Sequence, residues 1–422
     1  MKRFLCILLV MLAGLTALGQ DPLEAVHQDR CTVVGNHHPY IVPAIKDTRP
    51  QRGYKPFYFS YYGRHGSRFL SHVSSISRLL EVLDALHEAG LLTEQGEDIR
   101  SHVRNCGELH EGMEGMLTPL GYSEEQGISK RMYKRFRRIF RQRGSRKVIV
   151  RSSPITRSLQ TGTSFIMELQ KNAPRLNFDV LSGERFYFSN WDPNPSLDAL
   201  EHDVCDSIMR ASTDEEAAAK RIFTDPGKAA AVLGELPVYK LVYNAINVLS
   251  IGRCIGAEGE PLACFTDEEL LAFFKAHNAK LATWFINTEE TGCFRDTNTG
   301  APLLREFILR ADEALAGNGV CADLRFGHDT GVAPLMSLMR VEGYDHKGRL
   351  ADTWKYWPAW KNVPMGSNYA LVFYRNRRGD VLVKLILNEK ETAIPAVSPV
   401  KGPYYRWSDL REYCAGLCGL GD

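Results

Sequence analysis

The sequence lacks an excess of charge of either sign. Lys and Arg number 52 and Asp and Glu number 50 in a chain of 422 residues, whereas a general nucleic-acid binder usually carries a marked basic excess. Long apolar runs are scarce too, since none of 18 residues follows the first twenty positions. We therefore expect no nucleic-acid partner and no stable membrane insertion. The content of 44% apolar and 24% charged residues is typical of a globular protein.

Two short motifs are missing as well. No Cys-x-x-Cys pair occurs, which leaves a structural zinc site without support. No Gly-x-Ser-x-Gly elbow surrounds the hydroxyls of Ser152 and Ser153, so a serine hydrolase has little support. His37 and His38 have no carboxylate at a metal-binding spacing, and we interpret them as surface or structural residues rather than metal ligands.

The N-terminus has the pattern of a secretory signal. Two cations, Lys2 and Arg3, precede the apolar run of residues 4–12, and the small residues of 17–19 mark a cleavage site. We therefore predict a signal peptide over residues 1–19 and an exported protein, either periplasmic or extracellular.

Export would place the cysteines in an oxidising compartment. Of the ten cysteines, Cys6 falls within the predicted signal, and the other nine cannot all pair with one another. Cys254 and Cys264 flank a loop that contains Gly and Pro, and Cys414 and Cys418 lie four positions apart. Each of these two pairs is either a disulfide or two buried free thiols, and the sequence leaves both interpretations open.

Strand and helix patterns alternate near the start of the chain. Short apolar segments bounded by Gly or Pro predict strands at 55–63, 146–154 and 322–329. Amphipathic patterns predict helices at 74–90 and 118–140, between the first two strands. This alternation indicates an α/β fold, a three-layer core with a central, largely parallel sheet.

The middle of the chain differs, because residues 195–315 have helical periodicity and capping signals almost throughout. We predict an all-helical cap at 191–309, inserted into an α/β core formed by residues 20–190 and 310–422. A β-hairpin is predicted at 369–390, where two alternating apolar runs flank an Arg-Arg-Gly-Asp turn.

One run of charge, residues 130–147, contains ten cations and no acid. It either guides anionic substrates electrostatically or forms a solvated helix face whose cations suit the C-terminus of the helix. We favour the second interpretation, and the two are compatible.

Charged and histidine side chains follow each of the three predicted strands. They are Arg64, His65 and Arg68 after the first strand, Arg151 and Arg157 after the second, and His328 and Asp329 after the third. Ligands of an open α/β sheet bind beyond the carboxyl ends of its strands, so we expect these side chains to share one pocket. Arginines gathered in this way require an anion, and their forks match the oxygens of a phosphoryl group. Arg151 stays open, because it either joins this pocket or pairs with an acid in the core.

His65 has the surroundings expected of a nucleophile. The flanking Arg64 and Arg68 oppose protonation of its imidazole and keep it neutral near pH 7. Covalent catalysis would then split phosphoryl transfer into two easier steps. Gly66 lacks a Cβ, which lets the turn tighten and a phosphate approach the backbone. A helix opening at Ser67 would offer its N-terminus to the same anion.

Four segments carry a family resemblance: YYGRHGSR, LTPLG with a later Gln, VRSSPITRS and FGHDTGVAPL. Their order resembles that of the histidine phosphatase superfamily, branch two, which includes acid phosphatases, phytases and multiple inositol-polyphosphate phosphatases. The resemblance covers roughly residues 35–395 and implies an α/β core with a helical cap.

The resemblance also implies a role for each site residue. The nucleophile is His65, which passes through a phosphohistidine, and the proton donor to the leaving alcohol is Asp329. The implied phosphate-binding residues are Arg64, Arg68, Arg157 and His328. No metal and no cofactor are implied.

Two subgroups of the family resemble different parts of this chain. His328, Asp329 and Thr330 match the form found in acid phosphatases and phytases, whereas the animal inositol-polyphosphate phosphatases usually have His-Ala-Glu there. The C-terminal LVKLILNEKE, after VPMGSN, looks most like the inositol-polyphosphate group. Phe69 and Leu70 stand where many members have Pro shortly after the second arginine, which affects loop shape rather than chemistry.

We therefore expect an exported phosphomonoesterase acting on small anionic phosphate esters, with inositol polyphosphates favoured and bisphosphoglycerate as a further candidate. One alternative is a broad-specificity histidine acid phosphatase. A more distant alternative is a protein that binds phosphorylated ligands without turnover. The presence of both His65 and Asp329 disfavours that last class, because a ligand trap needs no proton donor.

Overall fold

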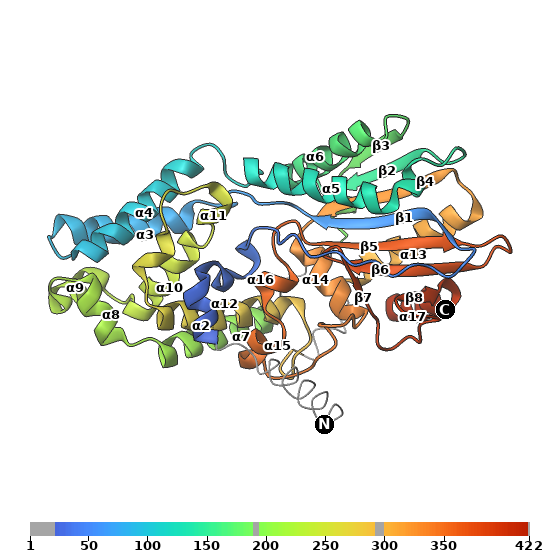
Figure 1. Ribbon diagram of the computed structural model, residues 1–422. Helices are drawn as coiled ribbons and strands as arrows, with labels where there is room; N and C mark the ends of the chain where they lie inside the picture. The colour runs from blue at the N-terminus through green and yellow to red at the C-terminus, as the bar shows by residue number, and fades with distance from the viewer. Residues whose placement is uncertain (1–21, 189–193, 292–298, 421–422) are drawn as a thin grey trace, which may run out of the picture.

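The computed structural model describes residues 22–188, 194–291 and 299–420. It has two parts, a sheet covered by helices and an all-helical part beside it (Figure 1). The predicted α/β fold with a helical domain is confirmed. The predicted signal peptide at 1–19 lies outside the described residues. Within those ranges, no helix is both long and apolar enough to cross a membrane.

The sheet has the strand order β3-β2-β4-β1-β5-β6-β7, with β8 paired to β6. The first four of these strands are parallel and the others antiparallel. In chain order, the strands are β1 (Lys55–Arg64), β2 (Lys147–Ser152), β3 (Asn177–Ser182), β4 (Val320–Gly327), β5 (Asn368–Arg375), β6 (Val381–Leu387), β7 (Lys390–Thr392) and β8 (Tyr404–Arg406). The three predicted strands and the hairpin are all present, and β3 is an additional edge strand.

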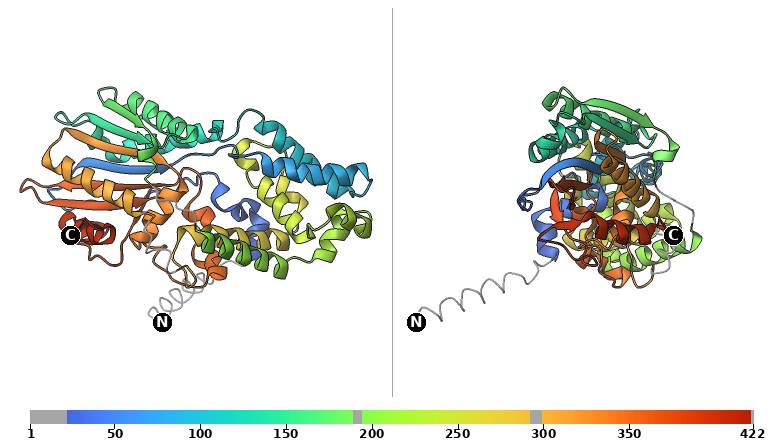
Figure 2. Two further views of the ribbon diagram at one scale, coloured as in Figure 1. Left: turned by 180° about the vertical axis from the view of Figure 1, so that it is seen from behind. Right: turned by 90° about the vertical axis from the view of Figure 1, so that its right-hand side faces the viewer.

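The side chains of β1 alternate between two hydrophobic cores, one on each face of the sheet. Tyr58 and Tyr62 belong to one hydrophobic core, while Phe59 and Tyr61 belong to another on the opposite face. Such two-sided burial is expected of a strand with helices above and below it. The three-layer arrangement is seen along the strands in Figure 2.

Helices cover both faces of the sheet. Those sharing the core of Phe59 and Tyr61 are α5 (Pro119–Phe140) and α6 (Thr156–Asn172). Those sharing the core of Tyr58 and Tyr62 include α13 (Ala301–Ala316), α14 (Asp329–Leu338) and α17 (Trp407–Cys418). At the start of α5, the Thr118 hydroxyl accepts the N–H of Gly121, and Pro119 occupies the first turn, where its missing N–H costs nothing.

The helical part has a hydrophobic core of its own. It is built from α2 (Pro22–Gln28), α3 (Ser74–Glu88), α4 (Glu94–His110), α7 (Pro195–Ser212), α8 (Glu215–Ile222), α9 (Pro226–Leu233), α10 (Val238–Leu249), α11 (Gly252–Ile255) and α12 (Asp267–Phe285). Two short helices, α15 (Thr353–Tyr356) and α16 (Ala359–Asn362), lie in the segment before β5. The predicted cap boundaries of 191–309 stay a prediction. The hydrophobic core of the helical part also includes α3 and α4, which lie well before residue 191 in the sequence.

Neither of the two suggested disulfides forms in the structure. All eight described cysteines are buried free thiols. The Cys254 thiol donates to the carbonyl of His37 at 3.0 Å instead of facing Cys264, and burial raises its pKa to about 12. Cys414 and Cys418 lie one turn apart on α17, inside the core shared with the sheet. In this structure, both pairs are therefore buried free thiols, which was the second of the two interpretations that the sequence left open.

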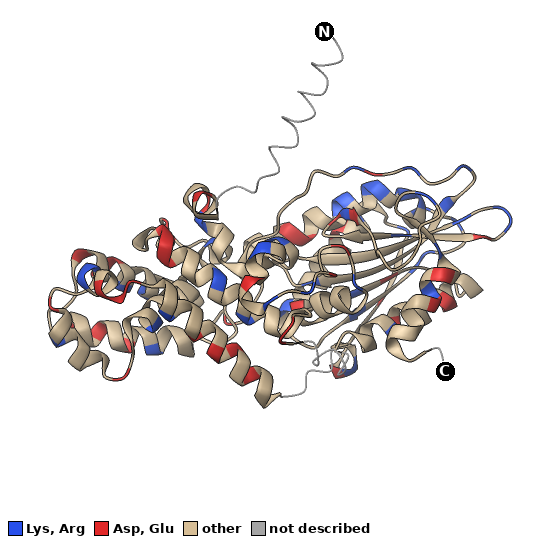
Figure 3. Ribbon diagram, turned by 90° about the horizontal axis from the view of Figure 1, so that it is seen from below, with Lys and Arg blue, Asp and Glu red and all other residues tan. Residues whose placement is uncertain are grey.

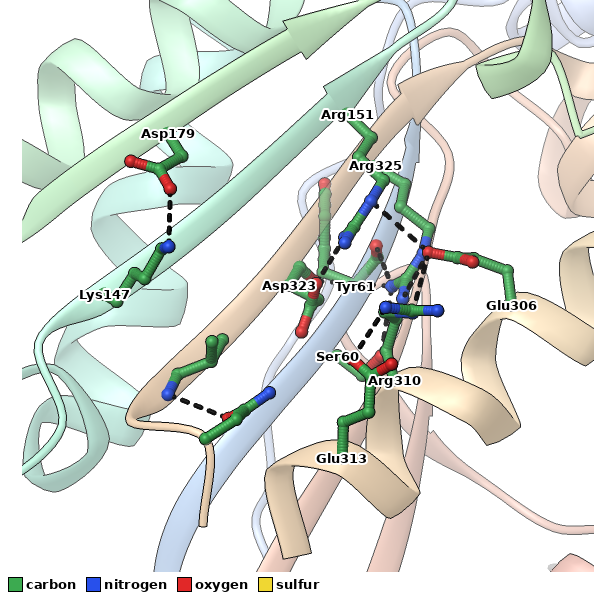
Figure 4. Close-up of polar contacts among 12 residues, drawn as sticks. Ser60, Tyr61, Lys147, Arg151, Asp179, Glu306, Arg310, Glu313, Asp323 and Arg325 are labelled. Carbon is green, nitrogen blue, oxygen red and sulfur yellow. Dashed lines mark hydrogen bonds and ion pairs between the residues drawn. The ribbon is translucent and has the colours of Figure 1, made fainter. Parts of the chain in front are cut away.

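A buried ion network on the sheet decides the place of Arg151 (Figure 4). Its guanidinium pairs with Asp323 of β4 and, at 3.4 Å, with Glu306 of α13. Asp323 also accepts a hydrogen bond from the Tyr58 hydroxyl at 2.8 Å. Arg325, fully buried, lies 3.8 Å from Glu306. Arg151 thus pairs with acids in the core, which was one of its two open interpretations.

Asp323→Ala should destabilise the fold by about 3–5 kcal/mol, because it leaves the buried charge of Arg151 without its closest partner. Asp179→Ala is the matched control. Asp179 occupies the corresponding position on β3, as both aspartates pair in register with Ile149, but its side chain is 51% exposed in its pair with Lys147. Losing that surface pair should cost less than about 1 kcal/mol. Urea unfolding measures both, and equal losses would contradict this account of the network.

Candidate active site

The adjacent ends of β1 and β4 bring the two histidines together. Arg64 and Gly327 are register partners at the carboxyl ends of these parallel strands, and the His65 N–H donates to the Gly327 carbonyl at 2.9 Å. His328 follows directly, so the two imidazole rings lie 5.6 Å apart between centroids. Residues separated by more than 260 positions in the sequence thus share the crevice where an α/β sheet binds its ligands.

Three arginines surround this point. Arg64 is completely buried, and its Nη1 donates to the carbonyls of Asn36 and Val363 at 2.8 and 2.6 Å. Burial, followed by the neighbouring charges of Arg157 and Arg64, lowers the pKa of Arg68 to about 10, and an arginine guanidinium keeps its proton in proteins. The three guanidinium groups are therefore charged when they meet here.

The Nε atoms of these arginines indicate that the site binds an anion. In Arg64, Arg68 and Arg157, this atom is buried and has no hydrogen-bond partner among the described residues. A buried donor that has lost water without gaining an acceptor costs about 1–3 kcal/mol, and more when it is charged. A phosphoryl group carries several anionic oxygens and would bring acceptors to a site that has these buried donors.

Within the described residues, only one ring nitrogen of His65 has a hydrogen-bond partner. Its Nδ1 lies 3.0 Å from the carbonyl of Gly66, and because a carbonyl only accepts, the proton of the neutral ring lies on Nδ1. Nε2 then carries the lone pair. Burial, followed by the charges of Arg64 and Arg157, holds the pKa of His65 well below its usual range. The imidazole is therefore neutral at pH 7, in the form that a nucleophile needs.

His328 is the opposite tautomer. Arg157 donates to its Nδ1 at 3.4 Å, so the ring proton lies on Nε2, which is 2.9 Å from the hydroxyl of Ser153. Burial and then the charge of Arg157 lower the pKa of His328 to about 3. The ring of Tyr187 stacks on it at 4.9 Å. These contacts fix the orientation of the imidazole beside the arginines.

Asp329 begins α14, immediately after His328, and faces Arg64. One oxygen lies 3.0 Å from Nη2 of Arg64 and accepts a hydrogen bond from the Asn36 amide at 2.8 Å. Burial would raise the pKa of this carboxyl, but Arg64 and the Asn36 hydrogen bond outweigh it and lower the pKa to about 2. Without an anion among the arginines, Asp329 is a carboxylate.

The predicted site residues are thus gathered in one place, and Arg151 is not among them. Sequence reasoning missed Asn36 and Tyr187, which have no signal in the sequence. It considered Ser153 only as a hydrolase nucleophile. Ser153 directly follows β2, just as His328 directly follows β4, and this position could have indicated that Ser153 belongs to the site.

The backbone of the loop after β1 is fixed by contacts with α5 and the residue before it. No helix opens at Ser67: its N–H and hydroxyl bind Glu124 and its carbonyl binds Thr118, so its backbone groups are not available to a helix, and α3 begins only at Ser74. The close approach that Gly66 permits is to α5, because a Cβ there would lie 2.8 Å from the carbonyl of Gly121.

The other histidine candidates make structural contacts. His37 Nδ1 lies 2.8 Å from the Ser250 hydroxyl, and His38 Nδ1 donates to the Pro39 carbonyl at 2.7 Å. In the described part of the chain, no three His, Cys, Asp or Glu side chains are placed to hold a metal ion. The donors around His65 are those that would bind an anion.

No family model matches this chain, and no curated protein matches it in sequence. Solved structures do match. The multiple inositol polyphosphate phosphatase of Bifidobacterium longum, in complex with inositol hexasulfate, is 18% identical, with a TM-score of 0.77 over 90% of this chain and 97% of that one. The phytase from D. castellii is 15% identical, with a TM-score of 0.66 over 92% and 85%. The Hafnia alvei phytase is 13% identical, with a TM-score of 0.52 over 88% and 98%.

This chain has the fold of those phosphatases. The likeness spans nearly the whole length of the Bifidobacterium longum enzyme and therefore includes both the sheet and the helical part. It agrees with the α/β core and helical cap that the four sequence motifs implied.

Proposed function

We propose that this protein is a phosphomonoesterase that uses His65 as its nucleophile. The observation that carries the proposal is the convergence of three charged arginines, each with an unpaired buried Nε, on a neutral imidazole whose Nε2 is free. The shared fold with a multiple inositol polyphosphate phosphatase and with phytases supports it.

In the first step, Nε2 of His65 bonds to phosphorus as the bond from phosphorus to the ester oxygen breaks. Asp329 gives its proton to that oxygen, and the alcohol leaves. In the second step, water attacks the phosphorus of the phosphohistidine as the bond from phosphorus to Nε2 of His65 breaks, the Asp329 carboxylate takes a proton from the water, and inorganic phosphate departs. The arginines and His328 hold the three phosphoryl oxygens during both steps.

Substrate binding itself would prepare Asp329 for this role. A phosphate dianion among the arginines offsets the charge of Arg64, which holds the carboxyl pKa down. It also places negative charge beside the carboxylate. Both changes raise the pKa of Asp329, so that a proton is taken up together with the substrate.

Inositol polyphosphates are the proposed substrate class. The support is the likeness to an enzyme solved with inositol hexasulfate, together with a site built from arginines. The test is phosphate release from phytate beside release from an aryl phosphate and bisphosphoglycerate. Turnover of phytate with a much higher kcat/KM than the others supports the proposal. Equal rates on all three indicate a broad-specificity acid phosphatase, and binding without release indicates a ligand-binding protein.

Export is part of the proposal and rests on the sequence pattern of residues 1–19. Mass spectrometry of the N-terminus after expression in a secreting host tests it. A mature chain that starts near Gln20 and lies outside the cytoplasm is expected, whereas an intact Met1 in the cytoplasm would refute it.

Arg157→Ala is expected to lower kcat by about 10²–10³-fold, because it removes one donor to the transferring phosphoryl group. It also removes the contact to His328 Nδ1. The matched control is Lys171→Ala, an exposed cation near the far end of the same helix, α6. Initial rates on saturating substrate measure the effect. A nearly unchanged rate in the Arg157 variant would remove this residue from the proposed clamp.

A further inference from the structure

Two neighbouring cavities at the other end of the sheet are lined by cations. The larger, of about 700 Å³, is lined by Lys55, Arg137, Arg138, Arg141, Arg143 and Arg375, together with four uncharged residues. The smaller, of about 370 Å³, is lined by Arg141, Arg143, Arg146 and Arg175 with five uncharged residues. Arg141 and Arg143 belong to both, so eight cations line the pair, and neither lining contains an acid.

Other arginines in the basic run of residues 130–147 pair with acids, whereas those that line the cavities do not, within the described part of the chain. Arg131 pairs with Glu389 at 2.6 Å and Arg135 with Asp47 at 3.0 Å, both on the side of α5 that faces the rest of the protein. In contrast, Arg137, Arg138 and Arg143 are exposed and form no ion pair within the described residues. Repulsion among them is therefore not offset by the protein itself.

The cavities lie far from His65. Lys55 is the first residue of β1 and Arg64 is its tenth, which separates the two ends by about 30 Å at ~3.3 Å per residue. The smaller cavity adjoins the start of β3, since Arg175 precedes Asn177 by two positions. Basic segments gather at this end of the sheet, away from the helical part (Figure 3).

We propose that the two cavities form a second anion-binding site, for a compact molecule that carries several phosphate groups. Seven of the eight cations are arginines, whose planar forks bind phosphate oxygens bidentately. Two concave spaces joined through Arg141 and Arg143 suit separate phosphates on one small scaffold. A flat bilayer surface would not enter them.

The test is isothermal titration calorimetry with inositol hexasulfate, a polyanion that offers no phosphate ester for hydrolysis. The wild-type protein is expected to bind two equivalents, one at the arginines around His65 and one at the basic cavities. Arg138→Glu combined with Arg143→Glu should weaken one of the two by roughly tenfold or more, with the other unchanged. The weakened equivalent should also have the steeper dependence on salt.

Lys130→Glu combined with Lys134→Glu is the matched control. Both lysines are exposed on α5 within the same basic run, but neither lines either of these two cavities. This variant changes the net charge equally and should keep both equivalents. Equal weakening in the two variants would indicate only a diffuse charge effect and would overturn the proposal.

Two other results would also overturn it. One is an affinity that is unchanged for both equivalents in the variant with Arg138 and Arg143 reversed. The other is binding to phosphatidylglycerol vesicles through these residues with no hexasulfate equivalent assigned to them, which would make this a membrane-facing surface. Absence of an anion site at the arginines around His65, which would refute the proposed function, gives a different pattern: a single equivalent in the wild type that the same charge reversal weakens.

Discussion

His65→Ala is expected to lower kcat by at least about 10³-fold, the scale seen when a covalent nucleophile is removed. The remaining arginines would still bind the phosphoryl group, so KM should change far less than kcat. The fold should survive, because the only hydrogen bond of the imidazole within the described residues is to the neighbouring carbonyl of Gly66.

Trapping of the intermediate gives this prediction a second readout. With a substrate labelled in its phosphate, the wild-type protein should retain an acid-labile, alkali-stable label after rapid denaturation, and the His65 variant should retain none. His72→Ala is the matched control, since His72 is an exposed histidine in the same loop. A His65 variant that keeps a few per cent of the wild-type rate, or keeps the label, would refute the nucleophile assignment.

Asp329→Asn should have an effect that depends on the leaving group. An inositol or glycerate alkoxide needs a proton as its bond to phosphorus breaks, and a positioned acid typically supplies ~10²–10⁴-fold in rate. Nitrophenolate is stable without a proton and needs far less help. We therefore expect a kcat loss in that range on phytate and a much smaller loss on nitrophenyl phosphate.

Measuring both substrates on one protein preparation provides the internal control. Asparagine preserves the shape of the side chain, but it removes the negative charge beside Arg64. That second effect acts on phosphate binding and hence on both substrates alike, so it cancels in the ratio of the two rates. Equal losses on both substrates would mean that Asp329 orients Arg64 or His328 and donates no proton.

The sequence predicted the site residues that follow strands. Arg64, His65, His328 and Asp329 stand directly after apolar segments, and parallel strands carry such residues to one edge of a sheet. Asn36 could not be predicted in this way. It lies 293 positions from Asp329 in the sequence, and only tertiary packing places its amide against that carboxylate.

Other parts of the prediction depended on partners that the sequence does not reveal. The sequence left Arg151 with two interpretations, and Asp323 on the neighbouring strand decided between them. The sequence left open whether a helix begins at Ser67. None does, because Glu124 of α5 and Thr118 before that helix bind the polar groups of Ser67. The local sequence pattern was enough to predict strands and helices, whereas the contacts between them depend on tertiary packing.

The position of β4 has a consequence for synthesis of the chain. This strand is made last of the four parallel strands, yet it lies between β2 and β1, which are the first two to be made. Until residues 320–327 leave the ribosome, β1 and β2 have no strand between them, and His328 and Asp329 are not in place. Such non-local pairing slows folding and leaves strand edges exposed in the meantime. A nascent chain that stops before β4 therefore holds His65 and all three arginines but cannot assemble the site, so the proposed hydrolysis of phosphate esters would not begin before the chain is nearly complete.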